Sequence, residues 1–368
     1  MRKFAVRTLL GVAAASVLWF ACSDDNPVSP EPAAFDILYV LNQADQTIYK
    51  YNAQTLVRID SLSTPVVEPH FIEFSRDHSC YYVIGRQVGG QIAKYRTADD
   101  SLLQLVTVPG TVFPTALAIS PNDDTVYVCD FSDTKGRIHR YAASGNNFAY
   151  LDSSLQAGYQ THDLHFASSG EFFVSVGFNS DDITIVNLDS GSTTPLLVQD
   201  ASTGFGTPPA GYGPYGVRVD NASELAIVAC RKGVDQIRVI DLLTRQLVDS
   251  IVIPTADQTS SAMAGPTMMH VAPDNDIVYV TGFTDNRVWV VRLSTASVVQ
   301  TIPLGTARPF MVMADQSGDR VYVSTTGFRP DDGTLYVIDG QSYQVIDSVA
   351  AGSEPFGFSI LHHQGGHH

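Results

Sequence analysis

The chain has little positive charge. It carries 22 lysines and arginines against 38 aspartates and glutamates, which gives a formal net charge of −16 at pH 7. Proteins that bind nucleic acid or anionic lipid surfaces use clusters of cations to contact phosphate. The composition therefore predicts that the chain has no nucleic-acid partner, and that any membrane contact comes from something other than a basic surface.

Motifs of metal and catalytic chemistry are missing. There is no CxxC or Cys/His spacing of a zinc site, no HExxH, no nucleophile elbow and no phosphate-binding loop. The acidic turns "SPNDDTV", "GFNSDDIT" and "RPDDGTL" lack the alternating ligand spacing of a calcium loop, and Asx turns explain them. No cofactor is therefore predicted, and copper and calcium are kept only as alternatives.

The N-terminus has the features of a signal peptide. Arg2, Lys3 and Arg7 precede an apolar stretch that ends at Ala21 and is too short to span a bilayer comfortably. The sequence around Cys22 resembles a bacterial lipoprotein signal, in which the cysteine after a small residue is acylated and becomes the new N-terminus. This resemblance implies that residues 1–21 are removed and that Cys22 carries lipid, which anchors the chain to a membrane.

Residues 22–34 are acidic and rich in proline, so we predict an extended tether. The stretch "SDD" (23–25) resembles an export signal that places lipoproteins on the outer face of the outer membrane. We therefore expect an exported outer-membrane lipoprotein at the cell surface, with the periplasmic face as the alternative.

The three remaining cysteines are predicted to be buried free thiols. Their number is odd in an exported chain, which excludes complete internal pairing, and each lies in a strand-like run: Cys80, Cys129 and Cys230.

Helical periodicity is absent, and short apolar runs broken by Gly, Asn, Asp and Pro recur instead, as in an all-β protein. One repeated element begins at a proline or its equivalent, as in "EPHFIEFS" (68–75) and "RPFMVMAD" (308–315). A second reads "VYV" or a close variant, as at 126–128 and 321–323. Each element has seven copies, spaced about 48 residues apart, which is the length of a four-stranded propeller blade.

The two ends of the repeat array complement each other. The array opens at "FDILYV" (35–40) without an innermost strand and closes on "EPFGFSIL" (354–361), an innermost strand with nothing after it. We therefore predict that residues 35–361 form a monomeric, all-β, seven-bladed β-propeller of four-stranded blades, whose ring closes when the C-terminal strand completes the first blade. Residues 362–368 are predicted to be a flexible, histidine-rich tail.

The segments "VYVTGFTDNRVWVVRLSTASVVQTIPLG" (278–305) and "VYVSTTGFRPDDGTLYVIDGQSYQVIDSVAAG" (321–352) resemble the YVTN repeat family of seven-bladed propellers. The resemblance covers residues 35–361. It implies the fold but not one activity, because similar repeats occur in surface-layer proteins, in lactonase-like enzymes and in copper and quinone oxidoreductases.

A ligand site is expected at one end of the central channel, where the loops before the innermost strands meet the loops between second and third strands. Two long loops, 190–213 and 254–265, lie there. Along each innermost strand, the third and fifth residues after the proline position are apolar and are expected to pack between blades. The second and fourth point into the channel, and His70 and His162 lie just after the proline position, at the channel mouth. The candidate channel residues are His70, Glu73, His162, Asp163, His165, Arg218, His270 and Met313.

Three interpretations of these channel residues remain open. They line a solvated channel in which Arg218 pairs with Glu73 or Asp163. Alternatively, histidine and methionine side chains bind copper. In the third interpretation, a small anion or lactone is bound with Arg218 as the electrophile and Glu73 or His165 as the base. A separate anion-binding rim at the channel mouth is predicted from the cations Arg86, Arg231, Lys232, Arg287, Arg308 and Arg329.

The function predicted from sequence is therefore a lipid-anchored, non-catalytic binding scaffold at the cell surface. Its partners are the membrane, through the lipid on Cys22, and a protein, peptide or glycan at the loop face. A lactonase-like hydrolase or a copper-dependent redox enzyme is the alternative.

Overall fold

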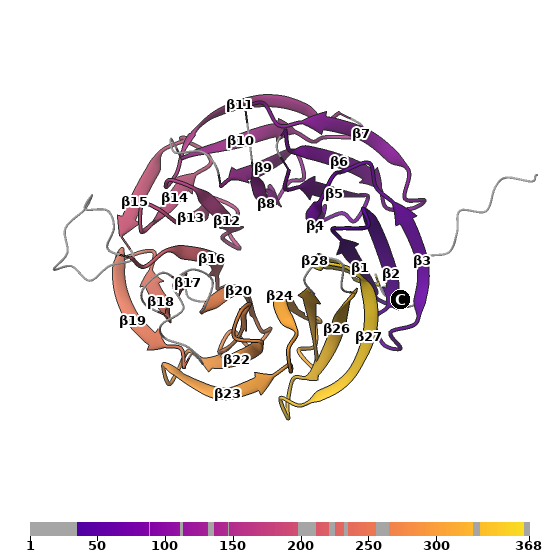
Figure 1. Ribbon diagram of the computed structural model, residues 1–368. Coiled ribbons are helices and arrows are strands. Elements are labelled where there is room, and N and C mark those ends of the chain that lie inside the picture. The colour runs from indigo at the N-terminus through magenta and orange to yellow at the C-terminus, as the bar shows by residue number, and fades with distance from the viewer. Residues whose placement is uncertain are drawn as a thin grey trace, which may run out of the picture. The chain divides into compact units, whose positions relative to one another are not determined.

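The computed structural model describes residues 35–87, 89–110, 113–131, 136–145, 147–197, 211–220, 225–231, 235–254, 265–326 and 332–363. The predicted signal peptide, tether and Cys22 lie outside these residues, as do most of the two long loops and residues 364–368 of the predicted tail. Within the described part, twenty-eight β-strands form seven antiparallel sheets of four strands, arranged as blades around a common centre (Figure 1). None of the described segments is a helix of the length and apolarity that crossing a bilayer requires.

The strands follow the repeats of the sequence. The first blade combines both ends of the array and consists of β28 (Pro355–Leu361), β1 (Ile37–Asn42), β2 (Thr47–Asn52) and β3 (Arg58–Ser63). The second consists of β4 (Pro69–Phe74), β5 (Cys80–Gly85), β6 (Gln91–Arg96) and β7 (Leu102–Thr107). The third consists of β8 (Pro114–Ile119), β9 (Thr125–Asp130), β10 (Arg137–Ala142) and β11 (Ala149–Gln156).

The remaining four blades continue in chain order. The fourth consists of β12 (Thr161–Phe166), β13 (Phe172–Gly177), β14 (Asp182–Asn187) and β15 (Thr193–Leu197), and the fifth of β16 (Pro214–Val219), β17 (Leu225–Arg231), β18 (Asp235–Asp241) and β19 (Gln246–Val252). The sixth consists of β20 (Pro266–Val271), β21 (Ile277–Gly282), β22 (Arg287–Arg292) and β23 (Ser297–Pro303), and the seventh of β24 (Arg308–Ala314), β25 (Arg320–Thr326), β26 (Asp332–Asp339) and β27 (Val345–Ser353).

The predicted ring closure is confirmed. Strand β28 pairs antiparallel with β1, so that Ile360 lies opposite Leu38, and Figure 1 shows the yellow end of the chain beside its indigo start. A side-chain bond reinforces the closure, because the amide of Gly352 donates to Oδ1 of Asn42 at 3.0 Å. The closure is thus made by hydrogen bonds between residues from opposite ends of the propeller.

Burial decreases from the centre of each blade outward. In the first blade, all six residues of β1 are buried, whereas nearly all residues of the outermost strand β3 are exposed. The sequence shows the same gradient, with "ILYVLN" in β1 and "RIDSLS" in β3. Apolar side chains of neighbouring blades pack face to face and fix the innermost strands around the central channel.

A left-handed residue precedes several innermost strands. Glu68, Gln160 and Glu354 have φ angles of 49°, 54° and 55°, and glycines occupy the equivalent positions before β16 and β20. Non-glycine residues rarely adopt this conformation, and it turns the chain sharply from the outer edge of one blade toward the centre of the next. The same backbone turn thereby sets the start of the channel-lining strand in these blades.

Candidate functional site

The centre of the propeller holds a pocket of about 510 Å³. Its wall is formed by the innermost strands β4, β8, β12, β16, β20 and β24 and by His362, which follows β28. The exposed lining residues Arg76, Ser168 and Gln316 come directly after innermost strands. The pocket therefore opens at the end of the channel where the innermost strands turn into the second strands.

The predicted alternation is confirmed on β4, whereas Leu117 and Ile119 on β8, which were expected to pack between blades, do so and also line the pocket. On β4, Ile72 and Phe74 pack into the cluster that joins the first and second blades, together with Tyr39 and Tyr81. Glu73, which lies between them, lines the pocket. The same alternation brings Asp163, His165, Arg218, His270 and Met313 into the pocket wall, so six of the eight predicted channel residues meet there.

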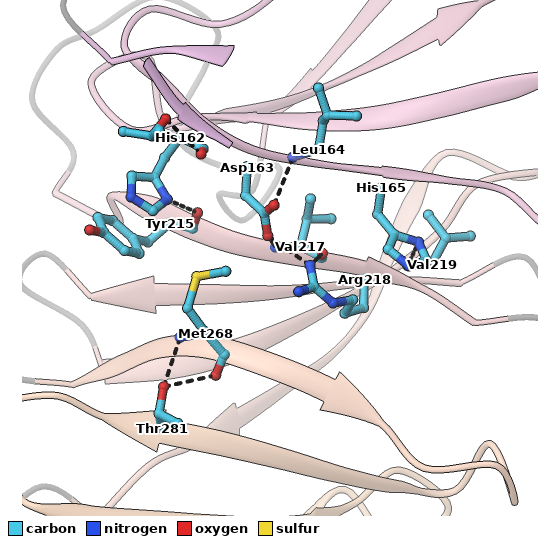
Figure 2. Close-up of polar contacts among 11 residues, drawn as sticks. His162, Asp163, Leu164, His165, Tyr215, Val217, Arg218, Val219, Met268 and Thr281 are labelled. Carbon is cyan, nitrogen blue, oxygen red and sulfur yellow. Dashed lines mark hydrogen bonds and ion pairs between the residues drawn. The ribbon is translucent and has the colours of Figure 1, made fainter. Parts of the chain in front are cut away.

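An ion pair joins two blades at the pocket wall. Nη1 of Arg218 on β16 lies 2.8 Å from Oδ2 of Asp163 on β12, one of the two partners considered for it in the first interpretation, and also donates to the carbonyl of Val217 (Figure 2). Asp163 additionally accepts from the amides of Val217 and Leu164, at 3.1 and 2.9 Å. Both charges are therefore compensated within the protein.

His165 and His270, two of the pocket-lining histidines, are neutral at pH 7. The amide of Val219 donates to Nδ1 of His165 at 3.2 Å, so the proton of the neutral ring lies on Nε2 (Figure 2). Burial, with the Arg218 charge as a second cause, lowers the pKa of His165 to about 3 and that of His270 to about 3. Each ring thus offers the pocket wall an uncharged hydrogen-bonding group.

Glu73 titrates near neutral pH. Burial raises the pKa of its carboxyl from 4.5 to about 7, against the opposing effect of Arg218 and with a further increase from Asp163. Unlike Asp163, the Glu73 carboxylate has no hydrogen bond to another residue of the described chain. It is therefore the acid whose hydrogen-bonding capacity remains available to a ligand.

His70 and His162 do not line this pocket. They lie near the starts of β4 and β12, away from the end where the pocket opens. The ring of His70 packs 5.1 Å from the ring centroids of both Phe310 and Phe356. The ring of His162 stacks on Tyr215 with centroids 3.4 Å apart, and its Nδ1 lies 3.0 Å from the Tyr215 carbonyl. Burial lowers the pKa of both imidazoles well below the ordinary value. Aromatic rings thus pack against both imidazoles at this end of the channel.

The predicted cationic rim belongs to this aromatic end. Arg231 is only 6% exposed, and its guanidinium lies 4.3 Å from the Tyr215 ring centroid. Arg308 lies 5.7 Å from the Phe283 ring centroid. Arg287 donates from Nε to a backbone carbonyl at 2.9 Å, and none of the three, nor Arg86, lines the pocket. Lys232 and Arg329 lie outside the described residues.

The expected position of the channel mouth therefore differs from that of the pocket. A ligand site was expected at the loops before the innermost strands, and most of the two long loops there lie outside the described residues. The pocket opens at the other end, where it is lined by residues that were not predicted: Arg76, Asn275, Gln316 and His362. His362 is held in place by Asp36, whose Oδ2 lies 3.0 Å from its Nδ1. Each of these residues follows an innermost strand, which is the signal that would have found them.

Metal ligands do not gather among the described residues. In that part of the chain, no group of three or more His, Cys, Asp or Glu side chains lies close enough together to hold a metal ion. His165 and His270 both line the pocket but make no such group. Cys80, Cys129 and Cys230 are buried and free, which confirms the prediction of unpaired thiols.

Comparisons with known proteins agree with this fold. The family described as "Lactonase, 7-bladed beta-propeller" matches residues 100–360. A solved structure from Lactobacillus plantarum is similar at 18% identity and a TM-score of 0.71, covering 89% of this chain and 99% of that one. A functionally unknown protein from Desulfotomaculum acetoxidans is 14% identical with a TM-score of 0.66, over 89% and 99% of the two chains.

An enzyme also appears among the similar structures. Dihydro-heme d1 dehydrogenase NirN, solved in complex with DHE, is 14% identical with a TM-score of 0.61 and covers 89% of this chain and 76% of that one. At such identities these likenesses show the fold alone. No curated protein sequence matches the chain.

Proposed function

Because the chain belongs to the lactonase seven-bladed β-propeller family, and because its central pocket is lined by converging polar groups, we propose that it binds a small molecule in that pocket. The binding protein is anchored to the outer membrane through lipid on Cys22 and faces the outside of the cell. Its propeller is monomeric, and a protein, peptide or glycan at the loop face is a further partner.

The pocket itself carries this proposal. At about 510 Å³ it has the size of a small-molecule site, and its wall combines apolar side chains such as Phe71 and Met313 with a few placed polar groups. Glu73 supplies a hydrogen-bond acceptor, and Nε2 of His165 supplies a donor.

Binding is favoured over catalysis because the charged groups are largely satisfied. Arg218 and Asp163 compensate each other, and the imidazoles of His165 and His270 are neutral. The sequence also lacks a nucleophile motif. The pocket thus offers recognition groups more clearly than an activated nucleophile.

One observation favours a second candidate, lactone hydrolysis. A pKa of about 7 suits Glu73 to act as a general base at neutral pH, where it would take a proton from an attacking water. The Nε2 proton of His165 and the remaining guanidinium protons of Arg218 would then stabilise negative charge on the carbonyl oxygen. In this case lactone opening, followed as acid release, increases as pH rises through about 7 and is lost in Glu73→Gln.

A bulky substitution in the pocket tests the binding proposal. Met313 lines the pocket, so Met313→Trp should fill part of it, whereas Leu105→Trp adds the same side chain at a position that is 39% exposed on the outermost strand β7. We expect compounds from a small-molecule library to raise the melting temperature of the wild-type protein and of Leu105→Trp, but not of Met313→Trp. Compounds that stabilise all three proteins equally, or a library without any stabilising compound, would contradict a ligand site in this pocket.

A further inference from the structure

The acids that line the pocket differ in what they contact. Asp315, which follows β24, accepts hydrogen bonds within its own turn from the Ser317 hydroxyl and the Asp319 amide. Asp163 receives hydrogen bonds from two amides and from Arg218, whereas Glu73 receives none from the described chain. A carboxylate is an acceptor with room for several donors, and leaving it unmatched in a partly buried site is unfavourable. We therefore expect the hydrogen-bond donor for Glu73 to come from a ligand that enters the pocket.

The wall offers no uncompensated cation to attract an anion. The guanidinium of Arg218 is paired with Asp163 and also bonds the Val217 carbonyl, and His165 and His270 are neutral. Arg76 is exposed at the mouth rather than enclosed in the pocket. Among the lining groups on the innermost strands, the charge that remains for a ligand to meet is that of Glu73, and Asp315 just after β24 has the same sign.

The mouth of the pocket has the same sign of charge. Exposed acids lie in the described turns that follow the innermost strands β4, β8, β12, β20 and β24. They are Asp77, Asp124, Glu171, Asp274 and Asp319, and Arg76 is the exposed cation in these turns. A rim of one sign raises the local concentration of ligands of the opposite sign and speeds their entry. The field at this end thus favours cations, in agreement with the acid inside.

Apolar side chains line the pocket beside Glu73 and indicate that the rest of the ligand is apolar. Phe71 lies two residues before it on β4, Met313 lies on β24, and both line the pocket with Leu117 of β8. An aromatic ring and a thioether suit a hydrocarbon body, and the ring face also attracts a cation. A ligand with a compact positive group and an apolar body matches both kinds of surface.

We propose that the pocket selects amines, with the ammonium group of the ligand bound to the Glu73 carboxylate and its apolar body packed on Phe71 and Met313. This inference depends on the proposed function, because it names the class of molecule that the central pocket binds. Neutral His270 also lines the pocket and carries a ring nitrogen with a lone pair that can accept a hydrogen bond. Amine binding draws a proton off Glu73, so the pocket releases a proton when it fills near neutral pH.

Three probes of one shape separate charge from size. Benzylammonium, benzyl alcohol and benzoate are titrated calorimetrically into the full-length protein at about pH 8, where Glu73 is mostly ionised. We expect benzylammonium to bind about tenfold more tightly than benzyl alcohol, and benzoate to bind least. Glu73→Gln should remove the preference for benzylammonium and leave benzyl alcohol unchanged. Glu171→Gln, which removes an exposed acid of the mouth, should retain most of the preference.

The outcomes also separate this inference from the proposal on which it depends. Tighter binding of benzoate or benzyl alcohol than of benzylammonium overturns the amine inference, while loss of that binding in Met313→Trp would still support a ligand site in the pocket. An ammonium preference that survives in Glu73→Gln, or no binding of benzylammonium at all, also overturns it. Benzylammonium binding that is unchanged in Met313→Trp places the ligand elsewhere and contradicts both proposals. Proton release on binding, measured in buffers of different ionisation enthalpy, supports the role of Glu73.

Discussion

Glu73 should make the protein less stable as the pH rises, and Glu73→Gln should remove that effect. The carboxyl has a pKa of about 7 in the folded protein against an ordinary value of 4.5. Between these two pH values the folded state holds the proton that the unfolded state has released. The free energy of unfolding therefore falls as pH increases through this range, and below it the carboxyl is protonated in both states.

The magnitude follows from the separation of the two pKa values. At 1.36 kcal/mol for each pH unit, the carboxylate costs up to about 3 kcal/mol once it is fully ionised in the folded protein. Glutamine keeps the size and the hydrogen-bonding ability of the side chain but has no charge. Glu73→Gln should therefore match the wild-type protein near pH 4 and exceed its stability by up to about 3 kcal/mol above pH 8.

Denaturant unfolding of both proteins at a series of pH values measures this difference. Glu171→Gln is the matched control, since Glu171 is exposed at the same face and its replacement should change stability by less than about 0.5 kcal/mol. The pH dependence contributed by His165 and His270 is common to both proteins and cancels. A difference between wild type and Glu73→Gln that stays constant from acid to alkaline pH would refute the reasoning.

Three further predictions concern other parts of the chain. Deletion of residues 354–361 should open the ring and lower the melting temperature markedly, because β1 loses its antiparallel partner; an unchanged melting temperature contradicts the closure. Cys22→Ala should move the protein from the membrane fraction to the soluble fraction, and retention in the membrane fraction contradicts the lipid anchor. Arg218→Ala should destabilise the protein by about 3 kcal/mol or more, because Asp163 is left buried with an uncompensated charge, and much of this loss should be recovered in the double variant with Asp163→Asn. Equal stability of the single and double variants would show that the pair is not coupled.

The fold was predictable because it depends on a repeated pattern. Each blade repeats the same alternation of apolar and polar positions. An ambiguous strand assignment in one copy can therefore be settled by comparison with the other copies. The proline position fixed the register of the innermost strands, and the register then identified Glu73, His165 and His270 as pocket-lining residues. Ring closure was predictable for the same reason, since one innermost strand was missing at the start and present at the end.

The end of the channel at which the pocket opens was not predictable in this way. Alternation assigns a residue to a face of the strand but does not say how side chains from seven strands fill the space between them. His70 and His162 carry polar atoms at the start of their strands, which suggested a site there, but their neighbours Phe310, Phe356 and Tyr215 pack against them. Whether a channel end is filled depends on the volumes of side chains that are distant in sequence.

The contrast between Asp163 and Glu73 separates structural from functional acids in this channel. Asp163 joins two blades and is compensated by Arg218 and by backbone amides, so its charge is part of the packing. Glu73 has no hydrogen bond to the described chain and lowers stability at neutral pH, so packing alone does not explain it. Buried groups that are unfavourable for folding are typical of sites where binding or chemistry uses them. A ligand that donates to Glu73 would recover that free energy on binding, which makes this residue the most informative position to change first.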